Sequence, residues 1–169
     1  MKARQYTVTA VMLSGLALSG CSKRDGAETA AAPGAAKRPG TVTLEINDPA
    51  VSGGSVNMKL RIRLDDGWHT YSDPPGDSGM APDIEWRLPE GYSAGTLQYP
   101  TPETFREPAG TTYGYAGNVV LTVPLRIPDH ATPGTRATVA GTMSWLVCKE
   151  VCTALISEID ARVTISSAP

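Results

Sequence analysis

Several side chains on which enzyme sites are commonly built are scarce in this sequence. Its 169 residues include three cysteines, two histidines and one phenylalanine. They show no Ser-His-Asp arrangement, no phosphate-binding loop and no pair of carboxylates with an assignable role. The chain has 15 basic and 17 acidic residues and a net charge of −2, whereas nucleic-acid binding usually needs a clustered basic surface. We therefore expect no nucleic-acid partner and no cofactor.

Long apolar runs are scarce too, and the run near the N-terminus is too short to cross a membrane. It extends from Val8 to Leu18, whereas a transmembrane helix needs about 20 apolar residues. Lys2 and Arg4 precede it, and a positive segment followed by a short apolar run is typical of a secretory signal peptide. We predict a signal peptide over residues 1–20 and an exported mature chain.

The apolar run ends in Leu18-Ser19-Gly20-Cys21, which resembles the lipobox of bacterial lipoproteins. There the cysteine becomes the acylated first residue of the mature chain, so the resemblance implies lipidation of Cys21 and attachment to the lipid bilayer. Some lipoproteins carry an aspartate directly after the acylated cysteine, and this aspartate retains them in the inner membrane. Ser22 stands at that position here, so the outer membrane remains an alternative location. An ordinary signal peptide followed by an incidental cysteine is the alternative.

The residues that follow Cys21 are predicted to form a flexible tether. Up to residue 40 they include no large apolar side chain and consist mainly of alanine, glycine and charged residues. A stretch of this composition cannot bury enough apolar surface to order itself. We assign residues 21–40 as a lipid tether, which as a random coil would span about 25 Å on average.

Apolar and polar residues alternate with a period of two from residue 41 to the end of the chain. Strands with one buried and one exposed face show this pattern, and turn dipeptides such as Asp-Gly and Pro-Gly separate the alternating stretches. Short strands of this kind predict one all-β domain, an antiparallel β-sandwich, over residues 41–169. The stretches are Val42–Ile46, Val56–Leu64, Ile84–Leu88, Val119–Ile127, Val139–Val147 and Ile159–Ile165.

Cys148 and Cys152 lie between two of these stretches, with three residues separating them. A three-residue hairpin loop would place them opposite each other, where the Cα atoms of antiparallel partners are about 4.5–5.5 Å apart. A disulfide needs a Cα separation of about 4.4–6.8 Å. The spacing therefore permits a disulfide without proving one.

The alternation also predicts the direction in which the two cysteines face. Trp145 and Val147 belong to the core face of the incoming stretch, so Cys148 falls on the opposite face. Cys152 falls on the outer face of the outgoing stretch by the same argument. An apolar collar around an outward disulfide suggests a docking surface or a covering loop. The collar residues are Leu146, Ala154 and Ile156.

On spacing alone, the pair is consistent with either a structural disulfide or an exchanging one. A bond that closes so short a loop removes little entropy from the unfolded chain, which favours a chemical role. Exchange requires a thiolate, which positive neighbours favour. Lys149 supplies such a neighbour and Glu150 opposes it. Both interpretations stay open at this point.

Four segments of the sequence carry a resemblance to a known family: Gly67–Tyr71, Pro75–Gly79, Tyr113–Tyr115 and Trp145–Cys152. In this order they resemble the N-terminal periplasmic domain of the DsbD and ScsB thiol–disulfide reductases. The resemblance implies an immunoglobulin-like sandwich on the periplasmic side of the cell envelope. It also implies a cysteine pair that takes electrons from a thioredoxin-like or membrane electron-transfer protein and passes them to oxidised periplasmic proteins.

The resemblance further implies roles for single residues. Cys148 and Cys152 would be the redox pair, in which Cys152 forms the mixed disulfide with partners and Cys148 resolves it. Members of the family shield the pair with a cap loop that bears an aromatic residue, and residues 99–115 are the candidate here. The residues that could cap or tune the pair are Phe105, Tyr113 and His69, although a histidine in such a place is more often structural.

The chain departs from the full-length reductases, and two other functions stay open. We expect a lipid anchor in place of the eight-helix membrane domain and the thioredoxin domain, so electrons would come from another protein. Whether the chain is itself an enzyme is left open. Two thiolates with Met143 or His69 could bind Cu(I), although Met143 is expected in the core. A non-redox scaffold with an inert disulfide is the remaining alternative.

Overall fold

We describe the protein from a computed structural model that places residues 38–167, which contain strands and turns and no helix. Within these residues no helix is therefore long and apolar enough to cross a membrane. The predicted signal peptide, Cys21 and the tether up to residue 37 lie outside the described residues. The first strand begins at Gly40, one residue before the predicted start of the domain.

One sheet has four strands in the order β1-β3-β9-β6. All neighbouring strands in it are antiparallel, and the longest pairing joins β3 to β9. Three of the alternating stretches of the sequence fall in this sheet. The strands are β1 (Gly40–Glu45), β3 (Ser55–Leu64), β6 (Ser93–Ala94) and β9 (Asn118–Arg126).

The other sheet has seven strands, in the order β2-β11-β10-β4-β8-β7 with β5 also paired to β10. Its pairings are antiparallel except for that of the two-residue strand β2, which runs parallel to the end of β11. The strands are β2 (Ala50–Val51), β4 (His69–Gly76), β5 (Asp83–Arg87), β7 (Glu103–Glu107), β8 (Gly110–Ala116), β10 (Arg136–Cys148) and β11 (Cys152–Ser166).

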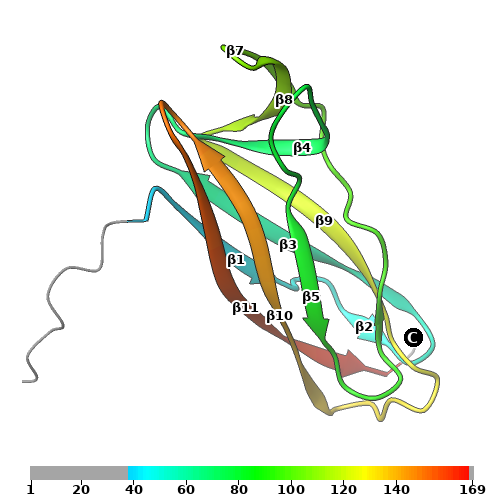
Figure 1. Cartoon of the computed structure of the whole chain (residues 1–169). Helices are drawn as coiled ribbons and strands as arrows, with labels where there is room; N and C mark the ends of the chain where they lie inside the picture. Colours follow the sequence, from blue (N-terminus) through cyan, green and yellow to red (C-terminus); the bar gives the residue numbers. More distant parts are fainter. Residues whose placement is uncertain (1–37, 168–169) are drawn as a thin grey trace, which may run out of the picture. The chain divides into compact units, whose positions relative to one another are not determined.

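The two sheets stack face to face and enclose one apolar core (Figure 1). Each long strand buries alternate residues, as the burial pattern of β3 shows. Leu60 and Leu121 of one sheet and Trp145 of the other are each 0% exposed. Because removal of apolar surface from water is the dominant favourable term in folding, this interdigitated layer is what holds the sandwich together. The predicted all-β, immunoglobulin-like sandwich is confirmed.

Strand β4 continues through a segment in which the sequence predicts a turn. Pro75-Gly76 is one of the Pro-Gly dipeptides that indicate a turn, yet β4 ends only at Gly76. The register between β4 and β8 shifts between Tyr71 and Gly76, because the two prolines of β4 cannot donate to the ladder. Pairing resumes where the Asp77 amide donates to the Thr111 carbonyl at 2.9 Å.

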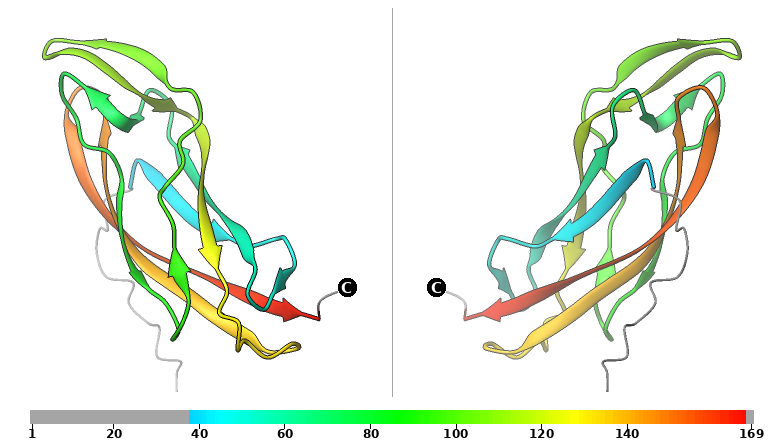
Figure 2. Two further views of the ribbon diagram at one scale, coloured as in Figure 1. Left: turned by 90° about the vertical axis from the view of Figure 1, so that its right-hand side faces the viewer. Right: turned by 90° about the vertical axis from the view of Figure 1, so that its left-hand side faces the viewer.

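The predicted cap loop is largely an ordered hairpin, formed by β7 and β8 and called the cap hairpin below (residues 103–116). Its two strands pair from Glu103↔Gly114 to Glu107↔Gly110. The cap hairpin and the turn between β10 and β11 lie at the same end of the sandwich (Figure 2). The cysteine-bearing turn and the segment predicted to cover it are therefore neighbours in space.

Candidate functional site

Cys148 and Cys152 are directly opposed residues at the end of the β10–β11 hairpin, and they form a disulfide. Their Cα atoms are 4.1 Å apart. The pairing continues without interruption from Arg136↔Thr164 to this last pair, so two long strands fix the position of both sulfur atoms. The opposition inferred from the three-residue spacing is confirmed.

The disulfide lies on the outer face of its sheet, as the alternation predicts, but its two halves differ in exposure. Cys148 pairs with His69 of β4, and directly paired residues in antiparallel strands project from the same face. Cys148 is nevertheless only 1% exposed, whereas Cys152 is exposed. Neighbouring strands and the cap hairpin therefore cover one sulfur-bearing residue and leave the other accessible.

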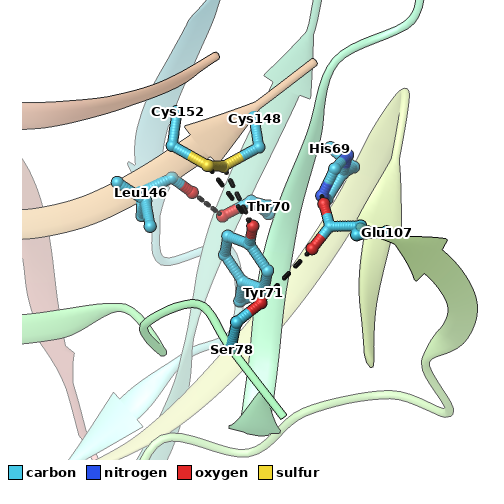
Figure 3. Close-up of polar contacts among 8 residues, drawn as sticks. All are labelled: His69, Thr70, Tyr71, Ser78, Glu107, Leu146, Cys148 and Cys152. Atoms are coloured by element: carbon cyan, nitrogen blue, oxygen red, sulfur yellow. Dashed lines mark hydrogen bonds and ion pairs between the residues drawn. A yellow bond between two sulfur atoms is a disulfide. The ribbon is translucent and has the colours of Figure 1, made fainter. Parts of the chain in front are cut away.

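Tyr71 provides the polar contact to the disulfide (Figure 3). Its hydroxyl donates a hydrogen bond to Cys148 Sγ at 2.9 Å and lies 3.7 Å from Cys152 Sγ. Tyr71 is 1% exposed, and a Cβ atom at Gly79 would come within 2.3 Å of its ring. The backbone at Gly79, which has a φ of +96°, therefore approaches the ring more closely than any other residue would allow.

The environment of Tyr71 keeps its hydroxyl protonated. Burial raises the pKa of Tyr71, and the nearby Glu107 carboxylate raises it further. The hydroxyl therefore stays protonated and can donate to Cys148 Sγ, which lies within hydrogen-bonding distance. The sequence indicated Tyr71 only as the last residue of the segment Gly67–Tyr71 that resembles the family. Its position two residues after His69 on one strand, and hence on the same face, is the signal that could have placed it at the site.

The cap hairpin contacts the scaffold through Phe105 and Glu107. The Phe105 ring stacks on the His69 ring with centroids 4.4 Å apart and an angle of 15° between the planes. Glu107 Oε1 lies 3.0 Å from His69 Nε2, and Ser78 Oγ donates to Glu107 Oε2 at 3.4 Å. Two of the three predicted capping or tuning residues, Phe105 and His69, are therefore brought together beside the disulfide.

Tyr113, the third predicted residue, does not belong to this group. It is 38% exposed and lines a separate hollow with Tyr99 and Asp73. In the β7–β8 pairing, Tyr113 is opposite Thr104, the residue directly before Phe105 on β7. The pleat therefore directs Tyr113 and Phe105 to opposite faces of the cap hairpin.

A pocket of about 500 Å³ opens between the disulfide and the cap hairpin. Its wall includes both cysteines, Tyr71 and the residues Phe105–Ala109 of the cap hairpin. The Lys149 ammonium, expected to assist a thiolate, donates to the Asp66 carbonyl at 3.3 Å. The pocket thus lies between Phe105 and the β10–β11 turn, with the disulfide in its wall.

Within residues 38–167 no group of three or more His, Cys, Asp or Glu side chains is placed to hold a metal ion. Met143, one of the two residues offered by the copper hypothesis as a further ligand, is 0% exposed and packs in the core cluster. It has odd parity on β10, so it projects from the face opposite to Cys148. Met143 therefore cannot join the two sulfur atoms in one site.

The sequence matches the family described as "Thiol:disulfide interchange protein DsbD, N-terminal" over residues 41–163. The chain belongs to this family. The DsbD N-terminal match extends from β1 into β11 and includes both cysteines. Membership places the chain among thiol–disulfide interchange domains, as the four resembling segments indicated.

Comparison with solved structures agrees with this family. The N-terminal periplasmic domain of ScsB from Proteus mirabilis is 25% identical, with a TM-score of 0.54, over 72% of this chain and 43% of that chain. The chain thus spans less than half the length of that structure. The major pilin subunit BcpA of Bacillus cereus is 9% identical over 75% of this chain and 40% of that chain, with a TM-score of 0.46. None of the curated proteins matches the chain.

Proposed function

We propose that this protein carries electrons between a thioredoxin-like partner and oxidised envelope proteins through the Cys148–Cys152 pair. The observation that carries the proposal is the asymmetry of the pair. Cys148 is buried and receives a hydrogen bond from Tyr71, while Cys152 is exposed beside a pocket. One sulfur is thus open to attack, and the other is held where a donor can stabilise it as a leaving group.

In the reducing half-reaction, a partner thiolate attacks Cys152 Sγ. A mixed disulfide forms between the partner and Cys152, and the bond between the two sulfurs of the pair breaks. Cys148 Sγ leaves with the electron pair as a thiolate, which the Tyr71 hydroxyl stabilises by hydrogen bonding. Exchange of this kind speeds up when the leaving sulfur is a better-stabilised thiolate.

The second thiol of the same partner completes the transfer of two electrons. It attacks the partner sulfur that is bonded to Cys152 in the mixed disulfide and releases Cys152 as a thiolate. The partner is oxidised to a disulfide and the pair is reduced. The reverse sequence on an oxidised client starts with attack by Cys152, and Cys148 then resolves the mixed disulfide. The client is reduced and the Cys148–Cys152 disulfide forms again.

We further propose a periplasmic location with a lipid anchor on Cys21. The described chain starts at the end of the sandwich that bears the disulfide, where the Asp65 amide donates to the Pro39 carbonyl at 2.8 Å and Lys149 donates to Asp66. The C-terminal end of β11 lies at the opposite end (Figure 1). A tether joined at this end would leave the cysteine pair within reach of membrane-bound partners. Retention of a Cys21→Ser chain in the membrane fraction would contradict the anchor.

The redox potential of the pair tests the proposed exchange most directly. We expect a potential between about −120 and −270 mV, the range of exchange catalysts, whereas stable structural disulfides lie below about −300 mV. The measurement equilibrates the chain, carrying Cys21→Ser so that one cysteine pair remains, against glutathione and dithiothreitol buffers. The reduced fraction is counted by thiol alkylation and mass spectrometry. A potential below the structural limit would favour an inert disulfide on a binding scaffold.

A further inference from the structure

The outer side of the four-stranded sheet carries an excess of positive charge. Directly paired residues of its strands project from this side together, as Thr41 of β1, Arg63 of β3 and Asn118 of β9 do. Within the four strands of this sheet, four cations and a single carboxylate project outward, and we call this side the basic face. Its charged residues are Lys59, Arg61, Arg63, Arg126 and Glu45.

The single carboxylate of the basic face lies among the cations. Glu45 forms an ion pair with Arg61 at 3.1 Å and is directly paired with Lys59 across the strands. At the end of the sheet nearest the disulfide, a hollow beside Arg63 adds charges of both signs, from Arg38, Asp65 and Asp66. With these included, five cations stand against three carboxylates, so two positive charges remain in excess.

The outer side of the other sheet has the opposite balance of charge. Its strands β5, β10 and β11 expose four carboxylates and three cations, which are Asp83, Glu85, Glu158, Asp160, Arg87, Arg136 and Arg162. The two sheets stack face to face, so their outer sides point in opposite directions (Figure 1). The domain is therefore polarised across the sandwich, although the chain as a whole has a net charge of −2.

The place at which the chain enters the domain favours a lipid surface as the partner of the basic face. Residues 22–37 separate Cys21 from the first described residue, and even a fully extended segment of this length spans only about 60 Å. The segment leads into β1, which is the edge strand of the four-stranded sheet. A domain confined so close to a membrane meets the lipid at a high effective concentration, so a weak attraction is sufficient.

We propose that the basic face docks on anionic phospholipid headgroups and holds the sandwich flat on the membrane. This inference rests on the proposed lipid anchor at Cys21. Cys148 and Cys152 project from the outer side of the opposite sheet, so in this orientation the disulfide faces away from the bilayer. Cys152 is then always open to partners, whereas a freely rotating tethered domain would turn it toward the lipid part of the time.

The test is sedimentation of the chain with sucrose-loaded vesicles. It uses residues 21–169 with Cys21→Ser, so that no acyl group contributes to binding. The vesicles contain either phosphatidylglycerol and phosphatidylcholine in equal parts or phosphatidylcholine alone. We expect binding to the anionic vesicles alone at about 0.1 M salt. We expect it to disappear at about 1 M salt, because the Debye length falls from about 10 Å to about 3 Å.

Two double variants that remove the same number of charges separate the basic face from net charge. Lys59→Gln with Arg63→Gln should lower the vesicle partition coefficient about 25-fold, since each cation near an anionic lipid surface contributes about fivefold. Arg136→Gln with Arg162→Gln is the matched control, because both residues are exposed on the opposite sheet. The control should stay within about twofold, since the two sheets alone are about 10 Å apart and the charges lie beyond the Debye length.

A third variant should change binding in the other direction. Glu45→Gln removes the carboxylate of the basic face and should strengthen binding to the anionic vesicles about fivefold. Unfolding cannot produce a gain that is confined to anionic vesicles and disappears at high salt. Equal binding to both kinds of vesicle, or equal loss in the two double variants, overturns the proposal and leaves an acidic protein surface as the other candidate partner.

A salt wash of cell membranes distinguishes failure of this proposal from failure of the lipid anchor. At about 1 M salt, attraction by the basic face is screened, whereas an acyl chain stays in the bilayer. Release of the parent chain by the wash would refute the anchor and support the basic face. A parent chain that resists the wash, with vesicle binding unchanged by Lys59→Gln and Arg63→Gln, would refute the basic face alone.

Discussion

A Cys152→Ser chain is expected to lose exchange with protein thiols completely, whereas a Cys148→Ser chain should accumulate a mixed disulfide with its partner. The difference follows from the positions of the two residues. Cys152 is exposed at the mouth of the pocket, and Cys148 is 1% exposed beneath Tyr71. The exposed sulfur alone can meet a partner, and the buried one is needed only to resolve the product.

The measurement uses chains that also carry Cys21→Ser and a thioredoxin that retains only its nucleophilic cysteine, activated as a mixed disulfide with an aromatic thiol. Non-reducing electrophoresis and mass spectrometry then report the covalent complex. We expect the complex with Cys148→Ser and none above background with Cys152→Ser. Equal trapping by both variants, or trapping through Cys148, would contradict the assignment of Cys152 as the residue that bonds to partners and Cys148 as the residue that resolves the bond.

A Tyr71→Phe chain is expected to be reduced by thioredoxin about thirtyfold more slowly, because a hydrogen bond to a charged group contributes roughly 1.5–3 kcal/mol. In the proposed exchange, Cys148 Sγ leaves as a thiolate, and the Phe side chain has no donor to offer it. Tyr71 donates to that sulfur at 2.9 Å, and its raised pKa keeps the proton on the hydroxyl. Since the donor favours the charged sulfur, its removal should move thiolate formation to higher pH.

Tyr115→Phe supplies the matched control for this effect. Tyr115 lies on neighbouring β8, is buried, and donates its hydroxyl to the Pro100 carbonyl at 2.7 Å. Stopped-flow rates with reduced thioredoxin, and thiolate absorbance of each reduced chain against pH, provide the comparison. If Tyr71→Phe and Tyr115→Phe slow the reaction to the same extent, the hydroxyl of Tyr71 has no special role at sulfur.

Much of the fold and the opposition of the two cysteines could be predicted from the sequence. The alternation of Val56–Leu64 and Val139–Val147 predicted long strands that the structure contains as β3 and β10. This worked because the side-chain period of a strand is two and one buried face repeats that period. The three-residue spacing of the cysteines predicted their direct opposition, which the register confirms.

Prediction from the sequence was wrong where a strand pairs with a segment distant along the chain and the local residues favour another structure. The prolines of Pro74-Pro75 indicated a turn, yet β4 passes through them because β8 and the Asp77 backbone contact hold the segment in place. The cap region, residues 99–115, was expected to be a loop, because the resemblance implied a cap loop there. Pairing along β8 makes it a hairpin, which is a case of tertiary context overriding local propensity.

By itself the sequence determined the all-β class, the outer face on which the cysteines project and the family to which the chain belongs. These depend on periodicity and motifs that lie close together along the chain. The tertiary structure alone decided that Cys148 is buried while Cys152 is not, that Tyr71 donates to sulfur, and that Glu107 meets His69. Tyr71 and Cys148 are 77 positions apart in the sequence, and Glu107 lies 38 positions after His69. Such contacts arise only when distant strands pair and bring their side chains to one face.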